Sequence, residues 1–278
     1  MSDDDLVLYD VDEDGVATVT LNRPERKNAW SLPMERRFYA VLREARLDPA
    51  VRVLVVTGAG RAFCPGMDVE RLERNAEPGA SLNLGERVPM YRERSMPKPM
   101  IAAINGACAG IGLVQALICD VRFAARGARM TTAFTRRGLA AEYNLAYVLP
   151  RLIGLEHALD LLLSGRTFDA DEARALGLVS RVVEPESLLD EARAYARDVA
   201  RNCSPRAMAV VRHQVYGDLD RDFVGALRRS YAAMEHFAGS ADFREGVASF
   251  TEKRSPKFDS LPADFDPEDA TRDGFLPY

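Results

Sequence analysis

Two glycine-containing turns carry the residue types in this chain that are best suited to chemistry. The first turn covers residues 60–68 and directly follows an apolar, valine-rich run. The second covers residues 105–112 and follows another apolar run. Glycines and small residues between a strand and a helix let backbone N–H groups project into a cleft. Two such groups aimed at one point form an oxyanion hole, which stabilises negative charge developing on a carbonyl oxygen.

The composition excludes several other classes of protein. A chain of 278 residues with 47% hydrophobic and 28% charged residues is ordinary for a globular enzyme. The net charge of −5 argues against a nucleic-acid partner. No apolar run reaches the ~20 residues that a membrane span needs. The acidic start at residues 1–5 is unlike a signal or transit peptide, so we expect a cytoplasmic protein with no membrane partner.

The cysteines and histidines give no sign of a metal site. No CxxC pair occurs and the three histidines are widely separated, so we expect reduced thiols and neither metal nor disulfide framework. Cys64 lies in the first turn and could be a nucleophile. No His or Lys lies near it in sequence to activate it, which favours a small residue whose backbone is what matters.

The elements that would position these turns alternate between strands and helices. The spacing predicts strands at 6–10, 16–21, 51–57, 100–104, 120–124 and 179–183. It predicts helices at 32–46, 110–119, 144–152, 156–163, from 169 to a stop at Gly177, 187–201, 205–216, 222–237 and 241–253. The segment 255–278 is rich in Asp and Pro and is expected to be irregular or partly disordered.

This alternation indicates an α/β protein with substantial parallel pairing. The pattern alone suggests a doubly wound sheet. Neither glycine turn reads GxGxxG at the start of a helix, however, so a dinucleotide site is not predicted.

The two turns together, Gly60-Arg61-Ala62-Phe63-Cys64-Pro65-Gly66-Met67-Asp68 and Asn105-Gly106-Ala107-Cys108-Ala109-Gly110-Ile111-Gly112, resemble those of the crotonase (enoyl-CoA hydratase/isomerase) superfamily. The resemblance covers roughly Val16 to Phe258. It implies an acyl-CoA thioester substrate, an enolate held by the oxyanion hole, and no cofactor beyond the CoA of the substrate. It also implies a spiral of β-β-α turns at 1–200, a helical oligomerisation lobe at 201–258 that builds trimers or dimers of trimers, and an irregular acidic tail at 259–278.

The resemblance implies which backbone groups form the oxyanion hole. One N–H belongs to Cys64, after the Ala-Phe pair, and the other to Ile111, in the middle of a family glycine triplet. Ile111 departs from the triplet, since a β-branched residue is stiff and disfavours positive φ. The hole survives if the turn keeps ordinary dihedrals there. Both loops could alternatively be tight packing turns.

The resemblance also places CoA recognition at both ends of the chain. The loop at 22–29 contains Arg26, Lys27 and Ala29, where the cations could meet phosphates. Phe250 and Lys253 match positions that reach the CoA of a neighbouring subunit. A solvated basic surface is the alternative for each. The other substrate-binding positions that the resemblance implies are Ala62, Gly66, Met67, Asp68, Gly110, Val114, Phe134 and Tyr143, with helix capping as a second role for Asp68.

The acid–base position decides the reaction. Family hydratases use two glutamates, and Val114 and Phe134 occupy those positions here, so neither can move a proton. Glu142 matches a third position, which is acidic in several isomerases. A base there could move one proton between C2 and C4 while the oxyanion hole holds the dienolate. Alternatively, Glu142 is a helix-start carboxylate or a surface partner of Arg136 or Arg137.

The resemblance thus predicts an enoyl-CoA isomerase that shifts a double bond between the 3- and 2-positions, as in fatty acid metabolism. Apolar walls would raise the pKa of Glu142, and the candidates are Phe134, Val114, Trp30, Tyr143 and Tyr147. The acyl pocket is expected to draw on 82–91.

Three alternatives remain open. A hydratase could use Glu142 to position water, with Tyr143 assisting. The chain could bind acyl-CoA without turnover. A thioesterase or dehalogenase-like enzyme could use Glu142 as a nucleophile.

Overall fold

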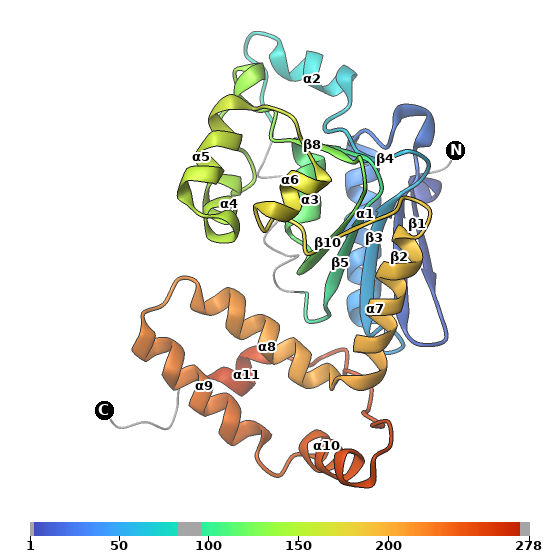
Figure 1. The fold of residues 1–278 in the computed structure, drawn as a ribbon, viewed down its shortest axis with the longest axis vertical. Coiled ribbons are helices and arrows are strands. Elements are labelled where there is room, and N and C mark those ends of the chain that lie inside the picture. The colour runs from blue at the N-terminus through green and yellow to red at the C-terminus, as the bar shows by residue number, and fades with distance from the viewer. Residues whose placement is uncertain (1–2, 83–95, 273–278) are drawn as a thin grey trace.

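Repeated strand–strand–helix units wind into two β-sheets and build the larger part of the molecule (Figure 1). The structure is a computed structural model and describes residues 3–82 and 96–272. The units are β3 (Val53–Gly58), β4 (Ala62–Cys64) and α2 (Val69–Ala76); β5 (Met100–Ile104), β6 (Ala107–Ala109) and α3 (Ile111–Leu117); and β7 (Val121–Ala125) and β8 (Arg129–Thr131), followed by α4 (Leu145–Ile153) and α5 (Leu155–Ser164). The spiral of β-β-α turns is therefore confirmed.

Each unit gives one strand to each sheet. The six-stranded sheet has the order β1-β2-β3-β5-β7-β10, and the four-stranded sheet has the order β4-β6-β8-β9. In the larger sheet β1 (Val7–Val11) runs antiparallel to β2 (Val16–Leu21), and the remaining pairs, out to β10 (Arg181–Val183), are parallel. In the smaller sheet β9 (Phe168–Asp169) runs antiparallel to β8. The doubly wound sheet suggested by the pattern alone is wrong, because the second strand of each unit leaves the large sheet for the small one.

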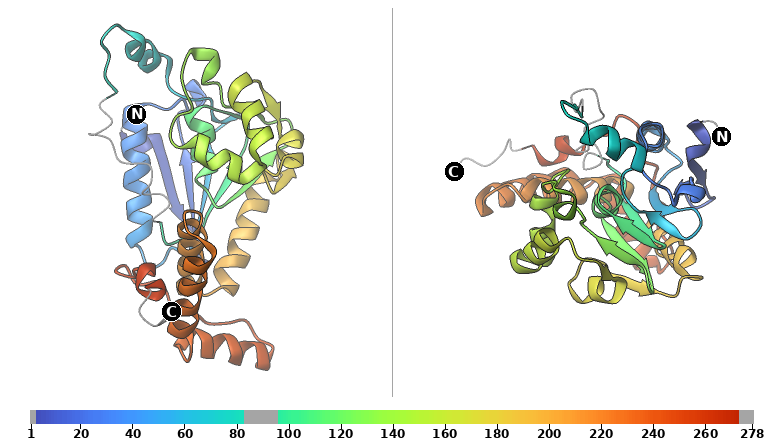
Figure 2. Two further views of the ribbon diagram at one scale, coloured as in Figure 1. Left: turned by 90° about the vertical axis from the view of Figure 1, so that its left-hand side faces the viewer. Right: turned by 90° about the horizontal axis from the view of Figure 1, so that it is seen from above.

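The large sheet lies between α1 (Leu32–Leu47) and α7 (Leu188–Asn202), as Figure 2 shows. Every residue of β3 and β5 is buried, as expected of parallel strands covered on both faces. The Ser31 side chain caps α1 by accepting from the Met34 N–H at 3.3 Å. This buried sheet is the rigid base from which both glycine turns emerge.

After α6 (Ala170–Ala175) and β10, the chain is mainly helical as far as residue 252. α7 is followed by α8 (Pro205–Asp218), α9 (Phe223–Phe237) and α10 (Ala241–Glu252), which form a lobe at the end of the molecule opposite α2 (Figure 1). Ser204 caps α8 as predicted, by accepting from the Ala207 N–H at 3.0 Å. Within residues 3–82 and 96–272, every helix is too short or too polar to cross a bilayer.

The tail corrects the expectation of an irregular segment. Pro267–Thr271 forms a short helix, α11, which packs against α8 and α9. Asp266 caps it by accepting from the Glu268 N–H at 3.0 Å, and Pro267 occupies a first-turn position that suits proline. Ala270 and Thr271 are each only 1% exposed. Burial of these two side chains orders a stretch whose composition is otherwise that of a loop.

Candidate active site

The first glycine turn joins β4 to α2 and is capped as the sequence predicts. The Asp68 side chain accepts from the Glu70 N–H at 3.1 Å and so caps α2. Gly66 has φ +112°, and a Cβ there would come within 3.2 Å of the Ala109 carbonyl oxygen. The left-handed backbone therefore favours glycine, and the close approach of the Ala109 carbonyl adds to that preference.

The second turn shows how Ile111 is accommodated. Gly110 carries the left-handed backbone, with φ +51°, and Ile111 is the first residue of α3. A β-branched residue fits there, because helical φ is what its side chain tolerates. Its N–H is one of the helix's first four, which have no partner within the helix. The departure from the family's glycine triplet therefore leaves this backbone donor in place.

The two turns lie directly against each other. A Cβ added to Gly112 would come 2.1 Å from the Cys64 carbonyl oxygen and 2.8 Å from the Cys64 Cβ. Such contact is impossible for any side chain, so Gly112 lets the start of α3 press against β4. Cys64 also lies opposite Cys108 in the parallel pairing of β4 with β6. The N-terminus of α3 and the backbone of Cys64 are thereby held as neighbours.

A small cavity joins these turns to Glu142. Its volume is about 50 Å³. It is lined by Pro65, Gly66, Met67, Leu72, Gly110, Ile111, Thr132, Ala133, Phe134, Arg137, Leu139 and Glu142. Residues from three separate segments of the chain, all singled out in the sequence, thus meet at one point. The sequence does not single out the lining residues Leu72, Thr132, Ala133 and Leu139, and it indicates Arg137 only as a possible surface partner of Glu142.

Glu142 sits at a strained bend. It is half-buried, and its carbonyl accepts from the Leu145 N–H at 3.1 Å at the start of α4. Tyr143 and Asn144 follow with φ +50° and +65°, a conformation that is uncommon outside glycine. Strained backbone of this kind concentrates at functional sites, where the surrounding structure holds it in place.

Several expected residues lie elsewhere. Val114 is 2% exposed and belongs to the hydrophobic core, one turn along α3 from Ile111. Trp30 is fully buried, stacks edge-on against Phe38 with ring centroids 5.4 Å apart, and is not a wall of the cavity. The Tyr147 hydroxyl hydrogen-bonds Asp220. Of the proposed apolar walls, Phe134 is the one that lines the cavity.

The Cys64 thiol is unsuited to nucleophilic attack. It is fully buried and lies 3.7 Å from the Gly66 carbonyl oxygen. Burial raises the pKa of the Cys64 thiol to about 12, so almost none is thiolate at neutral pH. Its backbone is the part of Cys64 that could serve chemistry. Among the described residues, no group of His, Cys, Asp and Glu side chains could hold a metal ion.

The loop expected to bind CoA is exposed at its cationic tip and tightly held at its base. Arg26 and Lys27 are exposed, and Arg26 lies 3.7 Å from Glu70. Lys27 and Asn28 have φ +54° and +63°. The Asn28 side chain is fully buried, whereas Arg26 and Lys27 before it are exposed. The tip is therefore presented to solvent by two consecutive left-handed residues.

Two buried or half-buried asparagines, missed from the sequence, fix the first turn. The Asn28 amide donates to the carbonyls of Ala59 at 2.9 Å and Ala62 at 2.7 Å. The Asn105 amide donates to the carbonyls of Gly58 and Gly60, at 2.8 and 3.0 Å. Asn105 begins the second turn, so its side chain ties one turn to the other. An asparagine beside a glycine turn is the only sequence signal for such a role.

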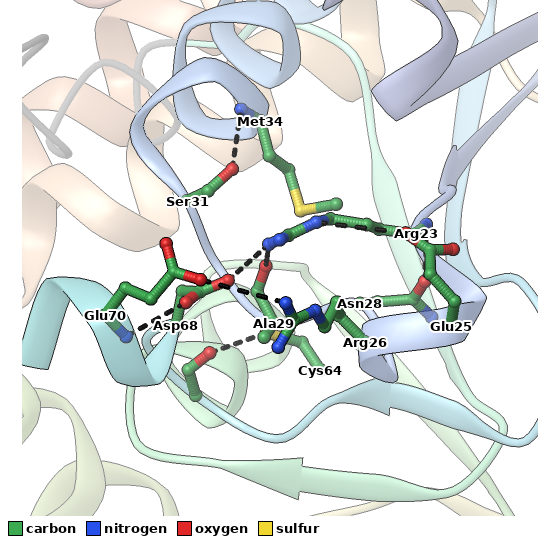
Figure 3. Close-up of polar contacts among 11 residues, drawn as sticks. Arg23, Glu25, Arg26, Asn28, Ala29, Ser31, Met34, Cys64, Asp68 and Glu70 are labelled. Atoms are coloured by element: carbon green, nitrogen blue, oxygen red, sulfur yellow. Dashed lines mark hydrogen bonds and ion pairs between the residues drawn. The ribbon is translucent and has the colours of Figure 1, made fainter. Parts of the chain in front are cut away.

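An ion pair closes the base of the loop (Figure 3). The Arg23 guanidinium donates to Asp68 at 2.5 Å and to the Ala29 carbonyl at 3.3 Å. Burial of Asp68 opposes its ionisation. The hydrogen bonds from Arg23 and from the Glu70 N–H outweigh that effect and hold the pKa of Asp68 below its usual range.

The remaining expected contacts do not line this cavity. Phe250 is 87% exposed on α10, and Lys253 ends that helix with φ +54°, at the end of the molecule opposite α2 (Figure 1). Leu82 lines a separate cavity of about 640 Å³ beside α1 and α2. The rest of the expected acyl-pocket segment, 83–91, lies outside the described residues.

Comparisons of this chain with a family model, with curated proteins and with solved structures all indicate the same family. The model of the enoyl-CoA hydratase/isomerase family matches residues 12–261. The chain is 36% identical to 1,2-epoxyphenylacetyl-CoA isomerase of Escherichia coli K12, over 88% of this chain and 95% of that protein. It is 50% identical to the enoyl-CoA hydratase EchA12_1 of Mycobacterium marinum, whose crystal structure superposes with a TM-score of 0.67 over 78% of this chain and all of that one. A probable enoyl-CoA hydratase/isomerase of Mycobacterium abscessus is 31% identical, with a TM-score of 0.84 over 92% and 99% of the two chains.

Proposed function

The chain belongs to the enoyl-CoA hydratase/isomerase family, and we propose that it isomerises an enoyl-CoA with Glu142 as the proton shuttle. The observation that carries the proposal is the cavity in which Glu142 meets Gly66 and Ile111, one residue from each glycine turn. No cofactor other than the CoA of the substrate is needed for this chemistry.

The oxyanion hole would consist of the Cys64 and Ile111 backbone N–H groups. The thioester oxygen would accept from both, and the dipole of α3 would add to the stabilisation of negative charge at its N-terminus. Glu142 would remove a proton from C2, the carbon next to the thioester carbonyl, which gives the dienolate. It would then return that proton to the carbon at the far end of the conjugated system, which moves the double bond.

Isomerisation is favoured over hydration by the residues at the two hydratase positions. Val114 is buried in the core and Phe134 lines the cavity, and neither side chain can activate water or protonate carbon. A single carboxylate suffices to shuttle a proton, whereas addition of water needs a second positioned group. One relative is named for a 1,2-epoxyphenylacetyl-CoA isomerase and others for hydratases, and the single carboxylate at this site supports the isomerase proposal.

We further propose that the active form is a homotrimer or a pair of trimers. The C-terminal lobe exposes large apolar side chains on three successive helices, including Phe223, Met234 and Phe250 at 80%, 66% and 87% exposure. Large exposed apolar side chains gathered on one lobe are typical of an interaction site. Phe250 and Lys253, remote from the cavity of their own chain, would then contribute to the CoA site of a neighbour.

Solvent deuterium exchange at C2 and C4 of a 3-enoyl-CoA tests the shuttle. We expect exchange and double-bond migration in the native protein, and loss of both by ~10²-fold or more in Glu142→Gln. Gln keeps the size and the backbone bend but cannot accept the proton. Incorporation of solvent oxygen into the product would instead indicate hydration, and a covalent acyl-enzyme would indicate thioesterase chemistry. Tight binding of the thioester without exchange in either protein would make the chain an acyl-CoA binder.

A further inference from the structure

We propose that the loop at 23–30 couples CoA binding to the oxyanion turn, with Asn28 as the positioning residue that transmits the effect. On this view, contact between the nucleotide end of CoA and the loop improves the geometry of the turn at 58–68. The nucleotide then contributes to the rate of the chemical step as well as to affinity. The inference rests on the proposed function, because it assumes that thioester chemistry occurs at this turn.

Hydrogen bonds join the loop to the turn along its whole length. At the start of the loop, Arg23 binds Asp68 at 2.5 Å. At its end, the Trp30 N–H donates to the Gly66 carbonyl at 2.8 Å, and the Asp68 N–H donates to the Trp30 carbonyl at 3.1 Å. The contacts at Gly66 and Asp68 lie immediately after Cys64, the proposed oxyanion donor. Hydrogen bonds therefore tie the loop to the turn at both ends of the loop.

Asn28 makes the central connection. Its side-chain Nδ2 donates to the carbonyls of Ala59 and Ala62. Its side-chain Oδ1 accepts from the Arg23 N–H at 2.8 Å. The amide nitrogen thus holds the turn, and the amide oxygen anchors the side chain within the loop. A buried amide with all partners met fixes geometry tightly, because losing one partner leaves a buried polar group unsatisfied.

The cationic tip lies next to this connection in the chain. Lys27 precedes Asn28 directly, Arg26 precedes it by one more residue, and both are exposed. The left-handed backbone at Lys27 and Asn28 is a strained conformation, which the chain would leave if the surrounding contacts did not hold it. A phosphate bound by the tip would oppose that relaxation. The restraint would pass through the Asn28 amide to Ala62, two residues before Cys64.

The coupling has a measurable kinetic consequence. Binding energy from a remote part of a substrate raises kcat when it is used to improve geometry at the reacting centre, and substrates that lack the remote part then lose kcat. A passive tether would instead change KM alone.

The experiment compares one 3-enoyl group carried on CoA and on pantetheine, which lacks the nucleotide. In the native protein we expect kcat to be lower with the pantetheine ester than with the CoA ester, by about tenfold or more. In Asn28→Gly, which tolerates the left-handed backbone but lacks the amide, we expect the two kcat values to agree within about threefold. Asn202→Gly is the matched control, since Asn202 is exposed at the end of α7 and its side-chain amide donates to Asp198 on the same helix. This variant should keep the native ratio.

A second readout separates positioning from simple loss of structure. A bound conjugated enoyl-CoA absorbs at longer wavelength as its carbonyl is polarised, so the shift reports the oxyanion hole directly. We expect the shift to be smaller for the pantetheine ester than for the CoA ester in the native protein, and the difference to vanish in Asn28→Gly. If that variant melts before assay temperature, Arg23→Lys, which loosens the link to Asp68, should reduce the same kcat ratio.

Two results would overturn the coupling while leaving the proposed function intact. One is equal kcat for both esters in the native protein with a difference in KM only. The other is an equal fall for both esters in Asn28→Gly, with the ratio preserved. Failure of the native protein to exchange protons in either ester would remove the proposed function itself, and the coupling with it.

Discussion

Gly112 approaches Cys64 so closely that a Cβ on the glycine would lie 2.1 Å from the Cys64 carbonyl oxygen. We therefore predict that Gly112→Ala separates α3 from β4. Overpacking at such a contact costs ~1–3 kcal/mol of stability, and misplacing one oxyanion donor costs ~10²–10³ in rate. Urea unfolding and proton exchange measure the two effects. The helical Gly246, whose Cβ would meet nothing nearer than 4.0 Å, is the control, and Gly246→Ala should leave activity unchanged.

Phe134 is predicted to limit the acyl group that the cavity accepts. Its side chain is 4% exposed and forms part of the wall. Phe134→Leu should raise kcat/KM for longer acyl chains relative to shorter ones by ~10-fold, the scale of one or two methylenes in an apolar pocket. Phe123→Leu provides the comparison, because Phe123 is buried against Tyr195 away from the cavity. If both variants alter chain-length preference equally, the wall assignment is wrong.

The ion pair of Asp68 with Arg23 is predicted to make stability depend on acid pH. The folded pKa of Asp68 lies below its unfolded value of about 3.9, so the stabilisation is complete above that pH and is lost as the pH falls through the folded pKa. Asp68→Asn keeps a capping side chain but removes the charge. The variant should be less stable at neutral pH, and the loss should shrink below about pH 4. Denaturant titrations at several pH values check this, and a loss that is the same at every pH would contradict it.

The cysteines are predicted to differ sharply in reactivity. Cys203 is exposed, whereas Cys64, Cys108 and Cys119 are buried. Burial raises the pKa of each of the thiols of Cys64 and Cys108. A chromogenic disulfide reagent should therefore titrate one thiol in the folded protein and the chain's four only after unfolding. Rapid modification of Cys64 in the native state would reopen its candidacy as a nucleophile.

The exposed apolar face of the C-terminal lobe is predicted to be covered by other copies of the chain. Sedimentation should give a trimer or a hexamer, and Met234→Asp on α9 should shift it towards the monomer, because a buried unpaired charge at an interface is costly. Leu47→Asp, at the exposed end of α1, should leave the assembly intact. A monomeric native protein would contradict the proposed assembly.

The long elements could be predicted from the sequence because their periodicity extends over enough residues. α1, β2 and β5 fall within one residue of the expected bounds, and the valine-rich β3 within two. The second sheet could not be predicted, since β4, β6 and β8 have three residues each and three residues show no alternation.

Some residues of the site could likewise be predicted from the sequence and others could not. Glycine turns and a carboxylate are visible as residue types, and Glu142 does meet the turns in one cavity. The partners of Asn28 and Asn105 are carbonyl oxygens, which every residue has, so no sequence pattern marks them. The burial of Val114 and Trp30 likewise depends on how helices pack over the sheet, which the local pattern does not contain.

The winding of the two sheets has a consequence for synthesis on the ribosome. Strands β2, β3, β5, β7 and β10 join the large sheet in the order in which they are translated, and each new strand pairs with the one before it. Until β7 has emerged, β5 presents an open edge, and parallel pairing at long sequence separation is slow. The second turn would thus take shape only after about half the chain has left the exit tunnel. Nascent chains that stop before β7 should neither bind acyl-CoA nor escape chaperones.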